Sequence, residues 1–258
     1  MRTIEINWKG KIGYGDIISP LCYSHALAVK NGIEVQLNMY WETSKGHLFK
    51  EKDSESLDYR QRFLFDLIEP IEQKVTLNQY FNDKLDYNHD NYDPTSPHHN
   101  YWYSKFKNTP GNFIVINTTE NNFQQFKDYS KHKQWKDPLG IEGFQKLREI
   151  LLKKYKVVEI DYSTPITTVV ELYKNCYCAV GYHGSTMWVA RYFRTPLIVF
   201  SSDHKTSKYA FPWAKILNNI DNFDLELFRN ESIHNLGLFE HEHIEYLKKP
   251  NLHRLRCS

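Results

Sequence analysis

The sequence predicts an α/β protein built from two open α/β domains, each a parallel sheet flanked by helices. Residues 1–40 and 112–202 both alternate short apolar runs with amphipathic segments, in the order strand, helix, strand. Residues 82–112 between them are rich in Asn, Asp, His, Pro and Tyr, a composition typical of a long loop and linker. A Gly/Ser/Thr turn at 181–186 joins a strand to a helix, the place where open α/β sheets bind ligands.

Three parts of the chain follow from this division. We expect an N-terminal domain over residues 1–111, a second domain over 112–220, and a helical tail over 221–258 that packs back on the first domain. Within the tail, residues 225–228 and 241–247 have helical character and are expected as two separate pieces.

The first domain opens with a predicted βαβ unit. Residues 4–8 alternate as in a half-buried strand, 10–16 form a glycine-rich turn, and 17–29 repeat apolar side chains at helical spacing. Asn31-Gly32 ends this helix, and residues 33–39 alternate again. Strand, helix and strand within about 40 residues imply a parallel pair with a right-handed crossover.

Two further features of this half follow from the residue pattern. Pro20 is expected in the first turn of the helix, where a missing N–H costs nothing. Residues 57–71 have apolar side chains on one side and predict another helix.

The second domain is predicted more regularly, as alternating strands and helices. The expected strands are 113–116, 156–160, 177–180 and 197–200, and the expected helices are 140–155, 166–175 and 185–193. The helix that follows the turn at 181–186 begins at Ser185 or Thr186, so its free N–H groups point into the loop and favour phosphate. Thr118 and Thr119 lie at another strand end and are candidate phosphate contacts.

Three motifs occur in a fixed order along these two halves. They are Gly13-Tyr14-Gly15-Asp16 with Pro20 shortly after, Lys133-Gln134-Trp135 before helix 140–155, and the loop 181–186 followed by Thr195-Pro196. Taken together they resemble the heptosyltransferase-type glycosyltransferases over residues 1–40 and 112–202. The resemblance implies the GT-B fold, in which two Rossmann-like domains face each other across a cleft that binds a nucleotide-sugar.

Asp16 is the candidate catalytic base. A carboxylate at the carboxyl end of a strand can reach an acceptor hydroxyl, and the resemblance assigns the same role to the aspartate after Gly13 and Gly15. The alternative is that Asp16 caps the following helix. Lys133 is the cation that the resemblance places beside the leaving diphosphate, and its alternative is a solvated lysine in the basic loop 127–136.

The start of helix 185–193 is the candidate donor site. Backbone N–H groups of Gly184, Ser185 and Thr186, with the two hydroxyls, would stabilise the developing negative charge. His183 would donate to a phosphate or a ribose hydroxyl, or else serves as a structural histidine. Lys205 and Lys208 follow the next strand and are further candidates for the same cleft.

Composition narrows the class of protein. The 258 residues carry a net charge of +2, with 41% hydrophobic and 15% aromatic residues, as expected for a globular protein with a full core. Neither a signal peptide nor an apolar run of membrane-spanning length is seen, which predicts a cytoplasmic protein. The four cysteines, Cys22, Cys176, Cys178 and Cys257, lack metal-ligand spacing and are interpreted as reduced.

Other chemistries find little support. The aspartates at 86, 90 and 93 lie in a loop-like stretch, and neither 98–99 nor 241–243 has usable ligand spacing, so no metal or cofactor is expected. No P-loop motif occurs, and the glycines of 10–15 do not match a dinucleotide fingerprint.

The sequence therefore predicts an inverting, metal-independent glycosyltransferase acting on a glycan of the cell-surface type, an acceptor implied by the resemblance. One alternative acceptor is the hydroxymethylated base of phage DNA, which the lysine-rich loops and many aromatic residues would suit. Another reading is a module that binds a nucleotide or sugar without catalysis, because His183 and Trp188 depart from the family's pattern.

Overall fold

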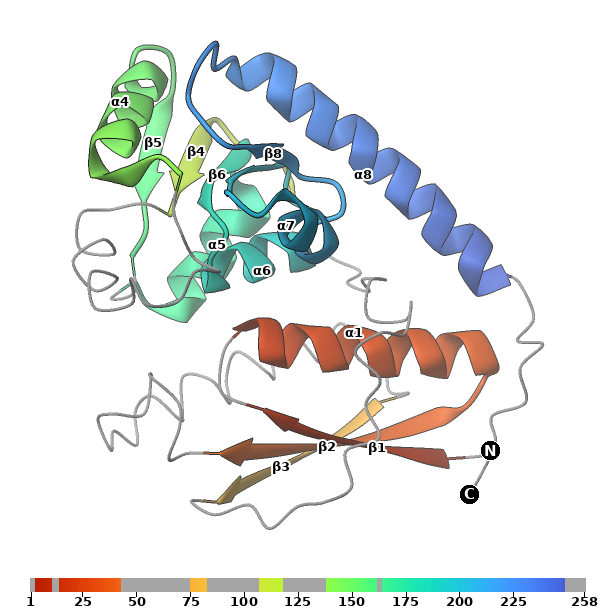
Figure 1. The fold of residues 1–258 in the computed structure, drawn as a ribbon. Helices are drawn as coiled ribbons and strands as arrows, with labels where there is room; N and C mark the ends of the chain where they lie inside the picture. Colours follow the sequence, from red (N-terminus) through yellow and green to blue (C-terminus); the bar gives the residue numbers. More distant parts are fainter. Residues whose placement is uncertain are drawn as a thin grey trace. The chain divides into compact units, whose positions relative to one another are not determined.

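The chain divides into two compact units in a computed structural model. The first unit comprises Met1–Lys105 and Glu240–Ser258, and the second comprises Phe106–Phe239. Each unit contains its own parallel sheet (Figure 1). The structure describes residues 3–10, 14–42, 75–82, 107–117, 138–161 and 164–248.

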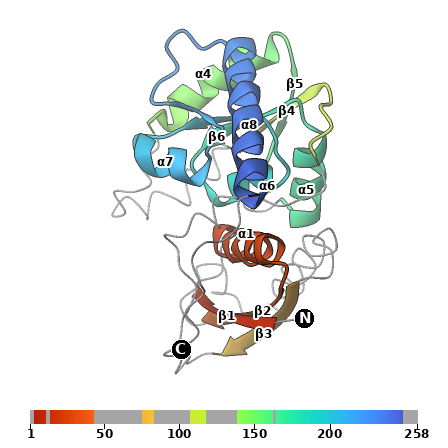
Figure 2. The same ribbon diagram turned by 90° about the vertical axis from the view of Figure 1, so that its right-hand side faces the viewer.

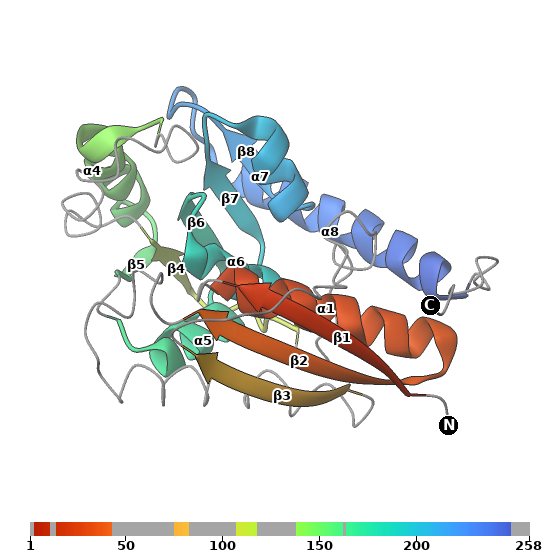
Figure 3. The same cartoon turned by 60° about the horizontal axis from the view of Figure 1, so that its bottom comes forward.

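The first unit contains a parallel sheet with the order β1-β2-β3. Its strands are β1 (Thr3–Gly10), β2 (Glu34–Glu42) and β3 (Val75–Asn82), which lie side by side in register (Figure 3). The first two strands and the helix between them confirm the predicted βαβ unit. Strand β3 was not predicted from the sequence, and the expected helix at 57–71 lies outside the described residues.

Helix α1 (Tyr14–Asn31) joins β1 to β2 and packs on the sheet. It begins earlier than the sequence predicts, so Gly15 and Asp16 belong to its first turn instead of to a loop. Pro20 therefore lies inside the helix, not in the first turn, and its missing N–H deprives the Asp16 carbonyl of the usual helical donor. Gly32, with φ of 60°, ends the helix. Its N–H donates to the Val29 carbonyl, and the N–H of Ile33 donates to the Ala28 carbonyl.

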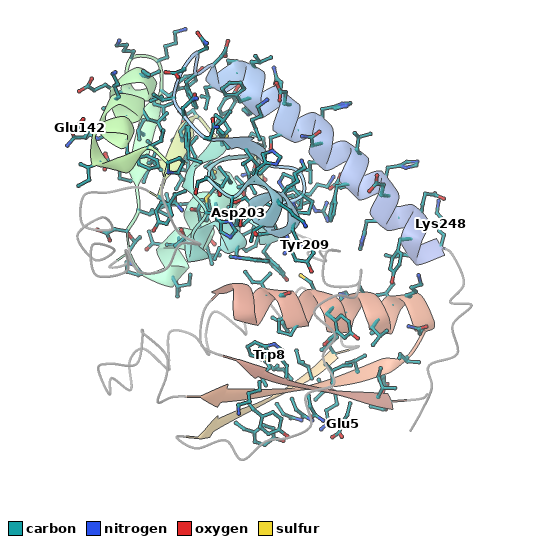
Figure 4. All side chains as sticks on the ribbon, in the orientation of Figure 1. Glu5, Trp8, Glu142, Asp203, Tyr209 and Lys248 are labelled. Carbon is teal, nitrogen blue, oxygen red and sulfur yellow. The ribbon has the colours of Figure 1, made fainter. Side chains whose placement is uncertain are left out.

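The two faces of this sheet differ in chemistry. Trp8 points toward α1, and Glu5 points to the opposite side (Figure 4). The α1 side carries the alternating apolar residues of the strands, such as Ile6, Leu37 and Met39, all buried. The opposite side carries a row of hydrogen-bonded carboxamides, those of Asn7, Asn38 and Asn78.

The second unit contains a parallel sheet of five strands in the order β5-β4-β6-β7-β8. Its strands are β4 (Phe113–Ile116), β5 (Lys156–Glu159), β6 (Cys178–Tyr182), β7 (Leu197–Phe200) and β8 (Lys215–Leu217). All four residues of β7 are buried, as expected for a strand covered on both faces. Four of these strands were predicted, whereas β8 was not.

Helices cover both faces of this sheet. They are α4 (Gly140–Leu152), α5 (Ile166–Asn175), α6 (Ser185–Tyr192), α7 (His204–Ala210) and α8 (Leu225–Lys248). On one face, Phe144 and Leu147 of α4 and Leu225 of α8 join alternate residues of β4, β6 and β7 in one apolar cluster. Each such fully buried side chain stabilises the fold by about 1.5–3 kcal/mol. Figure 2 shows the α8 ribbon running along the second unit. Helices α5 and α6 pack against each other, and α6 also contacts β6.

The C-terminal region differs from the prediction of two helical pieces. Helix α8 is continuous from Leu225 to Lys248, and its residues from Glu240 onward belong to the first unit. Helix α7, which begins at His204, was also not predicted. The thiols of Cys22, Cys176 and Cys178 are buried, and Cys257 lies outside the described residues.

Candidate functional site

The order of the strands marks one place on the second sheet. From β4 the chain moves to β5 on one side, and it then returns to β6 on the other side of β4. The connections that follow β4 and β6 therefore diverge, and open α/β sheets bind ligands in the crevice that forms there, outside the carboxyl ends of the strands. Asn117 directly follows β4, and His183 and Gly184 directly follow β6.

Asn117 bridges the two diverging strands. Its side chain is 1% exposed, and its backbone N–H donates to the Val180 carbonyl at 3.3 Å. Its Nδ2 donates to Thr186 Oγ1 at 3.1 Å, which connects the end of β4 to the first turn of α6. Sequence reasoning selected the next two residues, Thr118 and Thr119, and missed Asn117. The available signal was a carboxamide placed directly after a buried strand.

Gly181 of β6 makes room for this carboxamide. A Cβ atom at position 181 would lie 1.4 Å from Asn117 Oδ1, so any larger residue would displace the amide. The glycine is thus required by the close approach of Asn117.

Helix α6 begins without a side-chain cap. Gly184 is its N-cap residue, with φ of −136° and ψ of 171°, and glycine has no side chain with which to cap the first turn. The Tyr182 ring lies 2.7 Å from where a Cβ of residue 184 would be, so glycine is needed here too. The early backbone N–H groups of α6, those of Ser185 and Thr186 included, lie at the strand edge where an anion would be held.

The hydroxyl of Thr186 is engaged within the protein. It accepts from Asn117 Nδ2 and makes a hydrogen bond with Tyr173 of α5. Burial raises the pKa of Tyr173, and the bond with Thr186 opposes that shift only in part. The Tyr173 hydroxyl also lies 3.7 Å from Met187 Sδ. Thr186 therefore connects the start of α6 to the end of β4 and to α5.

His183 lies at the end of β6 and faces α7. Its backbone N–H donates to the Phe200 carbonyl at 3.3 Å, and its ring Nδ1 lies 2.7 Å from Ser207 Oγ. The imidazole also meets the Phe211 ring edge-on, with 4.9 Å between centroids. Burial lowers the pKa of His183 to about 4, although the nearby Asp203 carboxylate acts in the opposite direction. A pKa this low favours the neutral imidazole at pH 7.

Helix α7 begins at the carboxyl end of β7 with a well-formed cap. Asp203 accepts from the Thr206 N–H at 2.9 Å and from its hydroxyl at 2.6 Å, and these bonds lower the pKa of Asp203 (Figure 4). Lys205 and Lys208 both belong to this helix. Their placement on α7 was not foreseen, because the helix itself was not predicted.

The remaining predicted site residues fall into two groups. Gly13, Thr118, Thr119 and Lys133 lie outside the described residues. Gly15 and Asp16 lie in α1 of the first unit. The structure brings together His183, Gly184, Ser185 and Thr186 on one loop and helix start, as the sequence predicts for those positions.

In the part of the chain that the structure describes, no group of three His, Cys, Asp or Glu side chains is arranged to hold a metal ion. Among the helices in those same ranges, none combines the length and the apolar character that crossing a bilayer demands.

Comparison with known proteins gives few matches. No family model matches the chain, and no curated protein matches it. Among solved structures, the bacterial iron-containing dodecameric glycosyltransferase TibC from enterotoxigenic E. coli H10407 is 11% identical, with a TM-score of 0.47 over 94% of this chain and 75% of that one. The dodecameric iron-containing heptosyltransferase TibC in complex with ADP-D-beta-D-heptose is 10% identical, with a TM-score of 0.45 over 95% and 76%. At this degree of similarity neither superposition assigns a function to the chain.

Proposed function

We propose that this protein is a glycosyltransferase that moves a sugar from a nucleotide-sugar to an acceptor hydroxyl. The observation that carries the proposal is the uncapped start of α6 beside the point where β4 and β6 diverge. That position combines backbone N–H donors with the crevice in which open α/β sheets bind nucleotides.

The diphosphate of the donor is the group that this edge suits. The N–H groups of Ser185 and Thr186 would hold its oxygens, and the α6 dipole would stabilise the charge that develops as the sugar leaves. His183, neutral at pH 7, would add a hydrogen bond to a phosphate or a ribose hydroxyl. Thr118, Thr119 and Lys133 are further proposed donor contacts. No metal is needed in this mechanism, because backbone donors and Lys133 would stabilise the leaving group.

Asp16 is proposed as the general base. Its carboxylate would take the proton of the acceptor hydroxyl as the acceptor oxygen bonds to the anomeric carbon. The bond from that carbon to the diphosphate breaks at the same time, and attack from the opposite side inverts the configuration. Gly13 and Gly15 would let the backbone approach the acceptor closely. The proposed enzyme has the two-domain GT-B arrangement, and a glycan is the proposed acceptor.

The first experiment asks whether a nucleotide-sugar binds. Thermal shift with UDP-, GDP-, ADP- and CMP-sugars should reveal one donor that raises the melting temperature, since a ligand bound only to the native state stabilises it. The bound donor is then incubated with candidate acceptors, and transfer is followed by mass spectrometry. If none of the four donor classes shifts the melting temperature, the proposal is wrong.

Asp16→Ala separates an enzyme from a module that only binds. In an enzyme, this variant should keep the donor affinity and lose turnover by about 10²–10⁴-fold, the usual contribution of a general base. Asp221→Ala, which changes an exposed aspartate of the second unit, is the matched control and should keep wild-type turnover. A protein that binds the donor but transfers sugar to no acceptor would be the binding module.

Nucleic acid is a second candidate acceptor, favoured by the surface of α7. Lys205, Lys208 and Tyr209 are exposed on this helix, a pairing of cations and an aromatic ring that suits a polynucleotide. Binding to duplex DNA should then weaken steeply between 50 and 200 mM salt, as expected when phosphate contacts release counterions. A flat salt response removes this candidate.

A further inference from the structure

A buried serine faces the imidazole of His183. Ser207 lies in the middle of α7 and is 0% exposed, and its Oγ is 2.7 Å from His183 Nδ1. The distance alone leaves two arrangements open: the hydroxyl donates to Nδ1, or an Nδ1–H donates to the hydroxyl. The two differ in which nitrogen of the neutral ring carries the proton.

The surroundings of Ser207 decide between them. A helical serine often donates to the carbonyl four residues earlier, which is that of Asp203. That carbonyl already accepts from the Ser207 N–H at 3.1 Å and from Ser201 Oγ at 3.2 Å, so both of its lone pairs are used. Among the residues that the structure describes, His183 Nδ1 at 2.7 Å is then the acceptor for the Ser207 O–H. If Nδ1 carried the proton instead, the buried hydroxyl proton would lack an acceptor, at a cost of about 1–3 kcal/mol.

The ring itself is fixed in place for such a bond. The edge-on contact with the Phe211 ring, with 4.9 Å between centroids, restrains the imidazole, and the bond from the backbone N–H of His183 to the Phe200 carbonyl fixes the main chain at the end of β6. Burial keeps the imidazole neutral, as its lowered pKa indicates, so a single proton is shared between two nitrogens.

We infer that Ser207 is a positioning residue: by donating to Nδ1 it keeps the His183 proton on Nε2. The side chain of His183 then acts as a hydrogen-bond donor through Nε2, and not as an acceptor or a base. The tautomer follows from the geometry, whereas its use toward a phosphate or ribose oxygen rests on the proposed function. Ser207 would not touch the ligand and would act through His183.

The direct test is the tautomer of His183 in the wild-type protein. Long-range ¹H–¹⁵N correlation of the imidazole at pH 7 distinguishes the two ring nitrogens by which one carries the proton. We expect the Nε2–H form with an unprotonated Nδ1. An Nδ1–H form in the wild-type spectrum would overturn the inference, whatever the protein binds.

Variants show whether Ser207 is the cause. Ser207→Ala should give a mixture of the two tautomers, and Ser207→Thr, which keeps the hydroxyl, should restore the Nε2–H form. Ser232→Ala is the matched control, since Ser232 is also buried in the second unit but accepts from the Leu197 N–H and does not contact His183. An unchanged tautomer in Ser207→Ala would show that another group fixes the ring.

Donor affinity separates this inference from the proposed function. For the nucleotide-sugar identified by thermal shift, Ser207→Ala should weaken binding roughly three- to tenfold, the value of one hydrogen bond, while Ser232→Ala should not. If no nucleotide-sugar binds, the proposed function fails and the tautomer result still stands. If the donor binds but the tautomer is Nδ1–H, only the inference fails.

Discussion

The two sheets of this protein are both parallel, yet they are built on different principles. In the described part of the first unit, strands β1, β2 and β3 follow one another in the order of the sequence. In the second unit the order β5-β4-β6-β7-β8 reverses direction once, between β4 and β6. In open α/β sheets a ligand commonly binds where the strand order reverses, and among the described strands only the second sheet has such a reversal.

Polar side chains are used differently in the two sheets. Asn7, Asn38 and Asn78 stand in register across β1, β2 and β3, and their carboxamides form a ladder with bonds of 2.8 and 2.9 Å. At the reversal in the second sheet, the carboxamide of Asn117 donates to Thr186 in a helix. The row of carboxamides at Asn7, Asn38 and Asn78 links three strands on one sheet face. The carboxamide of Asn117 instead links the end of a strand to the start of a helix.

The largest effect on stability should come from a larger side chain at Gly181, where the strand order reverses between β4 and β6. Gly181→Ala would place a methyl group on the Asn117 amide, and overpacking of this kind should lower the free energy of unfolding by about 2–3 kcal/mol. In an Asn117→Ala background the same change should cost less than about 1 kcal/mol, because the two positions are coupled. Urea denaturation of the four proteins measures the cycle.

A glycine outside the reversal point provides the control. Gly237 in α8 has open space around its Cα, so Gly237→Ala should stabilise the helix by about 0.5–1 kcal/mol. Equal losses for Gly181→Ala in both backgrounds would mean that Asn117 is not what requires the glycine.

The amide ladder should respond more moderately. Asn38 accepts from Asn78 and from Gln36 Nε2 at 3.2 Å, so Asn38→Leu removes an acceptor from two donors. We expect a loss of about 1–3 kcal/mol in the same urea assay, the cost of unpaired polar groups. Thr76→Val, on the same face but exposed, should stay within about 0.5 kcal/mol of the wild type. A neutral Asn38→Leu would show that the ladder does not stabilise the sheet.

The smallest expected effect on stability depends on pH and concerns a contact at the amino ends of β5 and β6. Glu226 of α8 accepts from the hydroxyls of Tyr155 at 2.6 Å and Tyr177 at 2.7 Å, and these bonds hold its pKa below the usual 4.5. Because the folded-state pKa is the lower one, this stabilisation is present above pH 4.5 and is lost as the pH falls through the folded-state value.

Glu226→Gln tests this dependence. The variant should be less stable than the wild type near neutral pH, and the difference should shrink in acid. Thermal melts of both proteins from about pH 7 to pH 3 give the comparison. At the alkaline end the same contact raises the pKa of Tyr155 from 10.0 to about 12, so its contribution is complete below pH 10 and is lost as the pH rises from there through about 12. Parallel curves for the two proteins in acid would contradict the assignment.

Much of the second unit was predictable from local patterns. The bounds of β4, α5 and β7 agree with the sequence prediction, because each is a short apolar run or a clear amphipathic segment between turn residues. Strand β3 was missed because its sequence, VTLNQYFN, mixes polar and aromatic residues within a polar stretch. Helix α8 was divided in two because Gly237 and the polar residues around it interrupt the apolar pattern, although the helix continues.

The candidate site was predictable only in part. The turn at 181–186 is visible in the sequence, since Gly, Ser and Thr between a strand and a helix form a local signal. Asn117 and Ser207 were not, because their roles depend on strand order and on a contact across 24 residues of chain. No local pattern indicates that β6 lies beside β4, and this pairing is what gives Asn117 its partner.

Helix α8 has a consequence for how the protein is made. The second unit is one continuous stretch, Phe106–Phe239, and emerges from the ribosome as a whole. The first unit also includes the residues from Glu240 onward, which are synthesised after the second unit, although most of the first unit is synthesised before it. Completion of the first unit must therefore wait until the second unit has been synthesised, while the second unit is free to fold earlier.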